Sequence, residues 1–136
     1  MSVHQCEVFG HFFYSPELSY AELLEREAVL IESLDRTLQD LGGVHIEFTS
    51  EGDSLRVQCL FSAPEEGMFH AACDAVLPVL GHDMEGRFLF VDKDLKGLVL
   101  YCLAENQWKE AHMVLPSAAE GIRTAEKDPP VCVLPD

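Results

Sequence analysis

The ionisable residue with the most unusual position is a glutamate in the middle of an expected helix. Residues 20–41 carry apolar side chains at the three- and four-residue spacing of a single helix face. Glu27 lies near the centre of that stripe, seven residues from both Tyr20 and Leu34. A buried carboxylate must be paired, protonated or next to a cavity, because an unpaired buried charge is costly. Such surroundings can also turn a carboxylate into a general base near neutral pH.

Three interpretations of Glu27 follow. It could line a pocket between helix and sheet, which makes it a candidate catalytic residue. It could be held structurally by His11, Arg56, a tyrosine hydroxyl or backbone groups. Its stem could also lie on the core with the carboxylate at the edge. The structural interpretation is favoured, because buried carboxylates are only a statistical indication of function.

His11 is the second candidate catalytic residue. It alternates in phase with Phe9 and Phe13, and the sequence does not decide which face of the strand they occupy. If that face meets the helix, His11 and Glu27 could form a base and its orienting partner. Tyr20 and Tyr101 are then the candidate ligand-binding hydroxyls. A histidine satisfied in the core or at an interface is the simpler interpretation.

Two further polar groups are predicted to be structural. His70 and Asp74 are one turn apart on a second expected helix and are predicted to form a solvated pair. The turn 81–86 holds His82, Asp83 and Glu85 and could bind a cation weakly, although a plain polar connection is favoured. The sequence has no phosphate-binding, dinucleotide-binding, zinc-protease, nucleophile-elbow or calcium-loop motif. We therefore predict no metal site and no cofactor.

The cysteines indicate a reducing compartment. There are five, an odd number, and none lies in a CxxC pair. Four fall in apolar periodic segments, where free thiols pack as small hydrophobic groups, so only Cys132 is predicted to be exposed. The chain starts with no basic residue before its apolar residues and has no apolar run of membrane-spanning length. These features predict a cytoplasmic protein.

The net charge is the strongest global feature. The chain has 24 acidic and nine basic residues, a formal charge of −15, and residues 1–85 hold 16 of the acidic but only three of the basic ones. Such a surface repels nucleic acids and anionic membranes, so direct binding to either is not expected. It could attract a basic protein partner, or it could simply keep the protein soluble. Solubility is the favoured interpretation.

Hydrophobic periodicity predicts eight elements. A helix begins at Ser15 with Pro16, or at Ser19 with Glu22 as a capping box, and ends near Leu41 before Gly42. A second helix begins near Ser62, with Glu65 at capping-box spacing, and ends at Leu80. The predicted strands are residues 5–14, 44–49, 55–62, 87–92, 95–104 and 107–115. Residues 44, 46 and 48 are expected to face the core together with alternate residues of the following strand.

The element order β-α-β-β-α-β-β-β predicts an α+β fold. Its first six elements match a ferredoxin-like, split βαβ arrangement. The two C-terminal strands would widen one antiparallel-type sheet, and both helices would lie on one face of it. Residues 1–116 are predicted to form a single domain, and residues 117–136 an extended, poorly packed tail.

The opposite face of the sheet must also be covered. Residues 95–104 are apolar at nearly every position, and residues 8–13 carry large apolar groups in both phases. Near-continuous apolar strands are typical of sheets buried on both faces. The tail or a second copy of the chain could provide the cover, and we favour a homodimer.

These features favour binding over catalysis. The predicted function is that of a non-enzymatic binding or regulatory module, acting through protein–protein contacts and self-association. The alternative is a small dimeric enzyme or ligand carrier, with a pocket between sheet and helices around Glu27 and His11.

Overall fold

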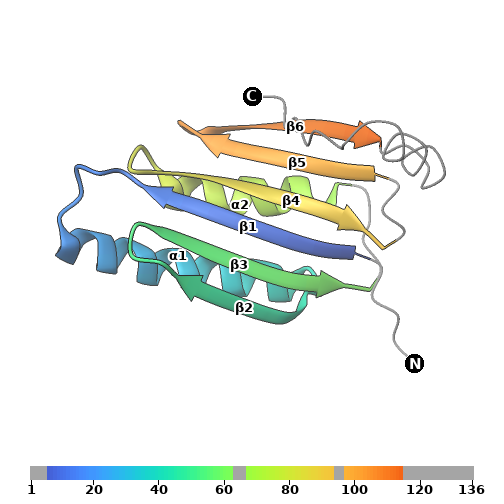
Figure 1. Ribbon diagram of the computed structural model, residues 1–136, viewed down its shortest axis with the longest axis horizontal. Coiled ribbons are helices and arrows are strands. Elements are labelled where there is room, and N and C mark those ends of the chain that lie inside the picture. Colours follow the sequence, from blue (N-terminus) through green and yellow to red (C-terminus); the bar gives the residue numbers. More distant parts are fainter. Residues whose placement is uncertain (1–5, 63–66, 94–96, 115–136) are drawn as a thin grey trace, which may run out of the picture.

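The computed structural model describes residues 6–62, 67–93 and 97–114 of the 136-residue chain. These residues form one six-stranded sheet with two helices packed on the same face (Figure 1). The elements are β1 (Cys6–Tyr14), α1 (Tyr20–Asp40), β2 (Val44–Ser50), β3 (Ser54–Phe61), α2 (Met68–Leu80), β4 (Met84–Asp92), β5 (Gly97–Ala104) and β6 (Gln107–Val114). The predicted tail, residues 117–136, lies outside the described residues.

The strands follow the order β2-β3-β1-β4-β5-β6, and every neighbouring pair is antiparallel. The α+β class, the single antiparallel sheet and the two helices are therefore confirmed. The last two strands widen the sheet at the edge beyond β4, also as predicted. Within the described ranges, no helix is long and apolar enough to cross a membrane.

Helix α1 begins and ends where the sequence indicates. The Ser19 side chain accepts a hydrogen bond from the backbone of Glu22, whose carboxylate accepts one from the backbone of Ser19. This capping box, and not Ser15, starts the helix. The chain leaves the helix through Gly42, at a φ of 96° that favours glycine.

Helix α2 begins later than predicted. Its N-cap is Gly67, with a φ of 85° and no side-chain hydrogen bond, so Ser62 does not cap it. Glu65, the expected partner of Ser62, lies outside the described residues. Strand β4 also differs from the prediction, because it begins at Met84, three residues early.

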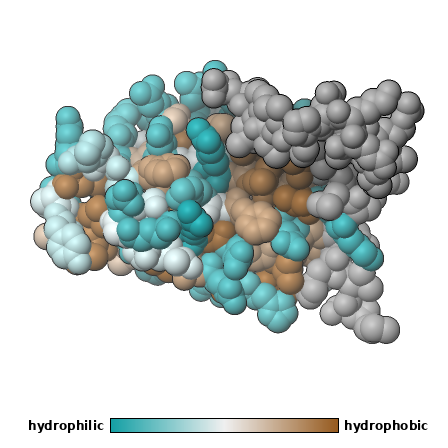
Figure 2. Space-filling model, viewed as in Figure 1, coloured by the Kyte–Doolittle hydropathy of each residue, from teal (hydrophilic) through white to brown (hydrophobic). Residues whose placement is uncertain are grey.

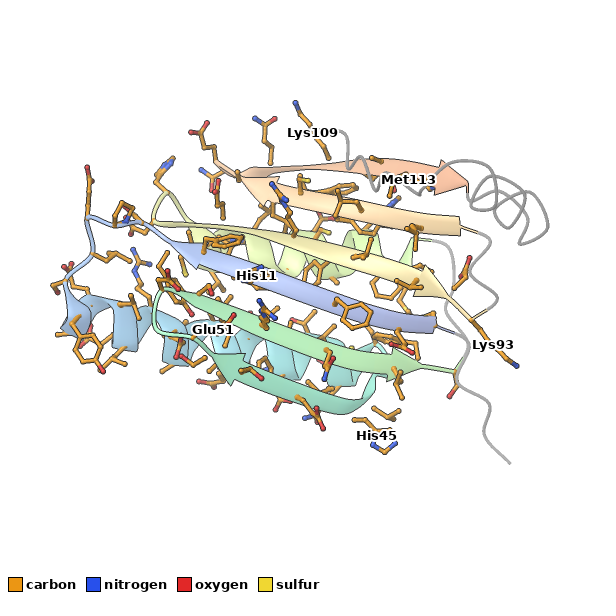
Figure 3. The ribbon with its side chains drawn as sticks, in the orientation of Figure 1. His11, His45, Glu51, Lys93, Lys109 and Met113 are labelled. Atoms are coloured by element: carbon orange, nitrogen blue, oxygen red, sulfur yellow. The ribbon has the colours of Figure 1, made fainter. Side chains whose placement is uncertain are left out.

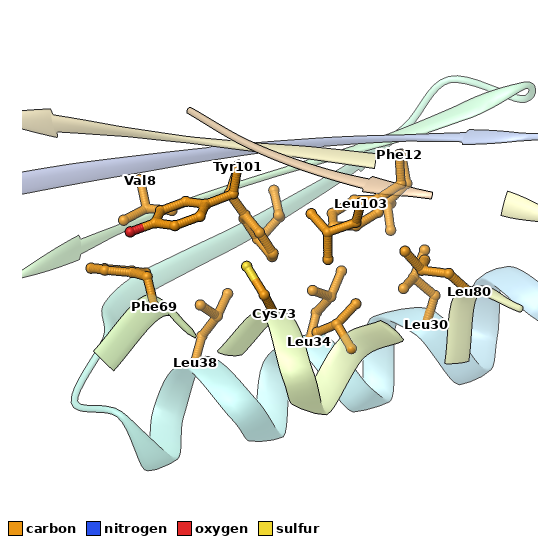
Figure 4. Packing of buried hydrophobic residues seen from close by; sticks show 14 of the residues in the cluster. Val8, Phe12, Leu30, Leu34, Leu38, Phe69, Cys73, Leu80, Tyr101 and Leu103 are labelled. Atoms are coloured by element: carbon orange, nitrogen blue, oxygen red, sulfur yellow. The ribbon is translucent and has the colours of Figure 1, made fainter. Parts of the chain in front are cut away.

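The core fills the layer between the helices and the sheet (Figure 4). Alternate residues of β1, from Cys6 to Tyr14, are buried against the helices, and the residues between them lie on the other face. The helices contribute Leu30, Leu34, Leu38, Phe69, Cys73, Val76 and Leu80 to this core. We call the face without helices the open face.

Three positions expected on the core side are exposed because of local geometry. Tyr20 is 74% exposed and Leu24 is 46% exposed, since the first turns of α1 extend past the ends of the strands (Figure 1). Val44 is 40% exposed because a bulge at His45, which has a φ of 55°, shifts the register between Val44 and Glu47. One extra residue reverses the phase of a strand, so Ile46 and Phe48 pack on the core while Val44 does not.

Phe12 packs in the middle of the sheet over a glycine. Gly86 lies opposite Phe12 in the register, and a Cβ atom added to Gly86 would lie 2.5 Å from Cε1 of the Phe12 ring. Because both are buried, Gly86→Ala should lower the free energy of unfolding by about 1–3 kcal/mol. Urea denaturation measures this loss. Gly97→Ala is the control, because a Cβ there meets only ordinary contacts, and an equal loss in both variants would contradict the account.

Candidate functional site

Glu27 is held by a tyrosine on the helix side of the sheet. Its side chain is 8% exposed, and the Tyr14 hydroxyl donates a hydrogen bond of 2.6 Å to Oε2 of Glu27. Burial, followed by the hydrogen bond and charge of Glu27, raises the pKa of Tyr14 far above its ordinary value. This geometry fits the structural interpretation of Glu27, with a tyrosine hydroxyl as its partner.

The four candidate site residues do not come together. His11 alternates with the buried residues of β1 and therefore projects from the open face, opposite Glu27. Tyr20 is exposed in the first turn of α1, and Tyr101 is buried against Phe69 on the helix side. The structure thus gives no support to a shared pocket between sheet and helices.

The pair of Tyr14 and Glu27 can be tested by denaturation. Tyr14→Phe should lower the free energy of unfolding by about 1–3 kcal/mol at pH 7, because the buried Glu27 carboxylate loses its donor. In a Glu27→Leu background the same change should cost nothing further, since the hydroxyl then has no acceptor to lose. Equal losses in the two backgrounds would show that the pair is not the cause.

The open face carries a group of apolar side chains in two adjacent rows. One row runs from Phe9 across the sheet, and the next begins at Val91, as the strand registers show. Phe9 is 39% exposed and Met113 is 46% exposed. We call this group the apolar patch: Phe9, Leu89, Val91, Leu98, Leu100, Ala111 and Met113. Figure 2 shows hydrophobic residues gathered on this face beside a more hydrophilic region.

A row of basic groups crosses the same face next to the apolar patch. His11 lies opposite Arg56 on one side and Arg87 on the other, and the row continues through Cys102 to Lys109. We call Arg56, His11, Arg87 and Lys109 the basic row. It contains three of the six Lys and Arg residues in the described ranges, although the chain as a whole is strongly acidic.

Glu51 neutralises one end of the basic row. Its Oε1 atom lies 2.7 Å from Nε of Arg56. The same atom lies 3.9 Å from Nε2 of His11, and Figure 3 labels both Glu51 and His11. The His11 ring rests against Phe13, with ring centroids 4.2 Å apart. Its Nε2 atom is buried and makes no hydrogen bond within the described part of the chain. Arg87, in contrast, has no ion-pair partner among the described residues.

A hollow of about 520 Å³ lies where the apolar patch meets the basic row. Its volume falls within the range of small-molecule sites, roughly 300–1,000 Å³. Its lining combines apolar, basic and acidic groups: Phe9, Gly10, His11, Glu47, Thr49, Glu51, Arg56, Val57, Gln58, Arg87, Leu89 and Leu100. This hollow is the best candidate for a functional site in the described structure.

Part of the basic row had a signal in the sequence. Glu105 and Asn106 both have positive φ and form a two-residue turn between β5 and β6. Such a turn fixes the register, so Lys109 could have been placed opposite Cys102. Arg87 could not have been placed beside His11, because β1 and β4 are far apart in the sequence.

His70 and Asp74 do not form the predicted solvated pair. Nε2 of His70 lies 3.0 Å from Oε2 of Glu110, and Asp74 accepts a hydrogen bond of 2.8 Å from Nε1 of Trp108. His112 also lies 3.4 Å from the Glu110 carboxylate. The hydrogen bond from His70, followed by that from His112, holds the pKa of Glu110 below its usual range. These contacts join α2 to the edge strand β6.

The ion pairs of α1 agree only partly with its helical spacing. Arg36 binds Glu32 at 2.8 Å, as expected one turn apart. Arg26 does not bind Glu22, because it forms an ion pair with Asp83 in the turn before β4. Within the described ranges, no group of three or more His, Cys, Asp or Glu residues could hold a metal ion.

The cysteines agree with the prediction at three positions. Cys6, Cys59 and Cys73 are free and buried. Cys102 is exposed, contrary to expectation, because its phase of β5 lies on the open face. Cys132 lies outside the described residues.

No protein-family model matches this chain, and no curated protein matches it.

Proposed function

We propose that the protein is a non-enzymatic binding module that acts through the open face of its sheet and self-associates there as a homodimer. The strongest support for this proposal is the apolar patch, which lies on two adjacent rows over four neighbouring strands. Contiguous exposed apolar groups are typical of interaction surfaces. The patch also accounts for the apolar residues in both phases of β5, since one phase meets the helices and the other meets the partner.

The charge distribution supports self-association at this face. Two chains of net charge −15 repel each other over most of their surfaces. On the open face, Arg56, Arg87 and Lys109 stand against the glutamates Glu7, Glu47, Glu51 and Glu85, so the local charge is close to zero and repulsion there is small. A two-fold dimer brings the same patch together from both chains. The remaining acidic surface is available to a basic protein partner, whose binding would weaken with salt.

We infer that β1 to β4 with the two helices form a ferredoxin-like, split βαβ unit. The order β2-β3-β1-β4 within the sheet supports this, since β3 separates β2 from β1. The free buried thiols support a cytoplasmic location.

Native mass spectrometry and sedimentation velocity of the full chain test the proposal. We expect a species of two chains at micromolar concentration, because a sheet face of this kind can supply a standard interface. A chain that stays monomeric up to about 100 µM would remove self-association from the account. A copurifying basic protein that dissociates in salt would indicate that the acidic surface, and not the sheet, is the main interface.

A further inference from the structure

We infer that the hollow on the open face binds a small monocarboxylate with an apolar body, and that Arg87 anchors its carboxylate. The ligand site rests on the proposed role of the open face as a binding surface, and it does not require the chain to dimerise.

Arg87 is the guanidinium of this hollow that has no ion-pair partner among the described residues. The neighbouring Arg56 is already engaged by Glu51 at 2.7 Å, whereas Arg87 has no ion-pair partner in the described ranges. Arg87 is also exposed and lines the hollow. A guanidinium can donate two parallel hydrogen bonds to one carboxylate, which gives both strength and orientation.

The histidine beside Arg87 supports an oxygen ligand at this position. His11 lies directly opposite Arg87 in the β1–β4 register, where Cβ atoms are about 4.5–5.5 Å apart. Its buried Nε2 atom makes no hydrogen bond within the described part of the chain. Buried polar nitrogens in folded proteins normally have a partner. That nitrogen lies 3.9 Å from the Glu51 carboxylate, beyond hydrogen-bond distance, and His11 lines the hollow, so an acceptor oxygen of a ligand there would supply the missing partner.

The other lining residues select the rest of the ligand. Arg56 and Arg87 are matched in number by Glu47 and Glu51 in the same hollow, so a doubly charged group such as phosphate would be repelled more strongly than a single carboxylate. Phe9, Leu89 and Leu100 form an apolar wall next to Arg87. A single negative charge joined to an apolar chain or ring satisfies both sides of the hollow.

Isothermal titration calorimetry with octanoate tests the inference, with 1-octanol and inorganic phosphate as reference probes. Octanoate should bind, and both reference probes should bind at least about tenfold more weakly, because each lacks one of the two required features. Arg87→Gln should weaken octanoate binding by about ten- to a hundredfold, the usual loss for a charged hydrogen-bonding partner. Arg87→Lys keeps the positive charge but cannot donate two parallel hydrogen bonds. Its affinity for octanoate should therefore lie between those of the wild type and Arg87→Gln.

Lys93→Gln is the matched control, since it removes one positive charge from an exposed position of the same chain outside the hollow. It should leave octanoate binding unchanged. Absence of octanoate binding, equal binding by Arg87→Gln, or phosphate binding as tight as octanoate would each overturn the inference. Circular dichroism verifies that every variant is folded.

Sedimentation of the same samples separates this inference from the proposed function. If the chain is a monomer that binds octanoate through Arg87, the ligand site is supported and the proposed homodimer is contradicted. A dimer through the open face covers Phe9, Leu89 and Leu100 of the hollow, so octanoate is titrated at chain concentrations where the monomer prevails. Absence of octanoate binding by the monomer would remove the site, whether or not the chain dimerises at higher concentration.

Discussion

Leu100→Asp should convert the proposed homodimer into a monomer, weakening self-association by at least about a hundredfold. Leu100 lies in the middle of the apolar patch, opposite Leu89 on one neighbouring strand and Ala111 on the other. In a dimer through the open face, the new carboxylate would be buried against the apolar patch of the partner. An unpaired buried charge costs several kcal/mol, comparable with the whole free energy of a micromolar dimer, about 8 kcal/mol.

The control for this prediction makes the same kind of change elsewhere. Val29 is 55% exposed on α1, away from the open face, so Val29→Asp should leave the dimer intact. Both variants should remain folded, because neither position is fully buried in the single chain. Sedimentation velocity compares them with the wild type. Dissociation by Val29→Asp, or an unchanged dimer with Leu100→Asp, would place the interface elsewhere.

Stability should fall steeply at alkaline pH. Burial is the main cause that raises the pKa of Cys6 to about 11, with the charge of Asp92 second. Burial likewise raises the pKa of Cys59 and of Cys73 to about 12. The unfolded thiols titrate near 9.0, so above that pH the unfolded chain releases protons that the folded chain retains. The free energy of unfolding is therefore unaffected by these thiols below pH 9.0 and decreases as pH rises from there toward 11 to 12.

The size of this decrease is large. Each thiol contributes about 1.4 kcal/mol per pH unit, so the three together contribute roughly 4 kcal/mol per unit. A domain of ordinary stability, about 5–15 kcal/mol, would lose much of it over two units. Urea denaturation at about pH 8, about pH 9 and about pH 10 measures the slope. Cys59→Ala should reduce the slope by about a third, and a free energy that does not change with pH would contradict the burial of these thiols.

Short sequence signals predicted the helices and strands, because the residues that start and end these elements act on their immediate neighbours. The capping box of Ser19 and Glu22 fixes the start of α1, and Gly42 ends it because the chain there turns left-handed. The errors have equally local causes. The bulge at His45 leaves no mark in the hydrophobic pattern, and Gly67 begins α2 without a side-chain cap.

The candidate site was not predictable because its phase and register depend on distant contacts. Strand β1 has apolar residues in both phases, so the pattern alone could not decide whether Phe12 or Phe13 faces the helices. Phe12 faces them because Gly86, across the β1–β4 pair, leaves room for its ring. That choice places His11 on the open face, opposite Arg87. The sequence therefore indicated His11 as a candidate residue, but the partner predicted for it, Glu27, lies on the other side of the sheet.

Cys102 offers the most direct test of the open face as the interface. It is the exposed cysteine among the described residues and lies between Arg87 and Lys109 on the open face, next to the apolar patch. In a Cys132→Ser background, its rate of reaction with a maleimide can be measured at about 1 µM and at about 200 µM chain. A dimer through the open face should slow this reaction at least about tenfold at the higher concentration. A dimer that forms while Cys102 reacts at the same rate at both concentrations would contradict the account.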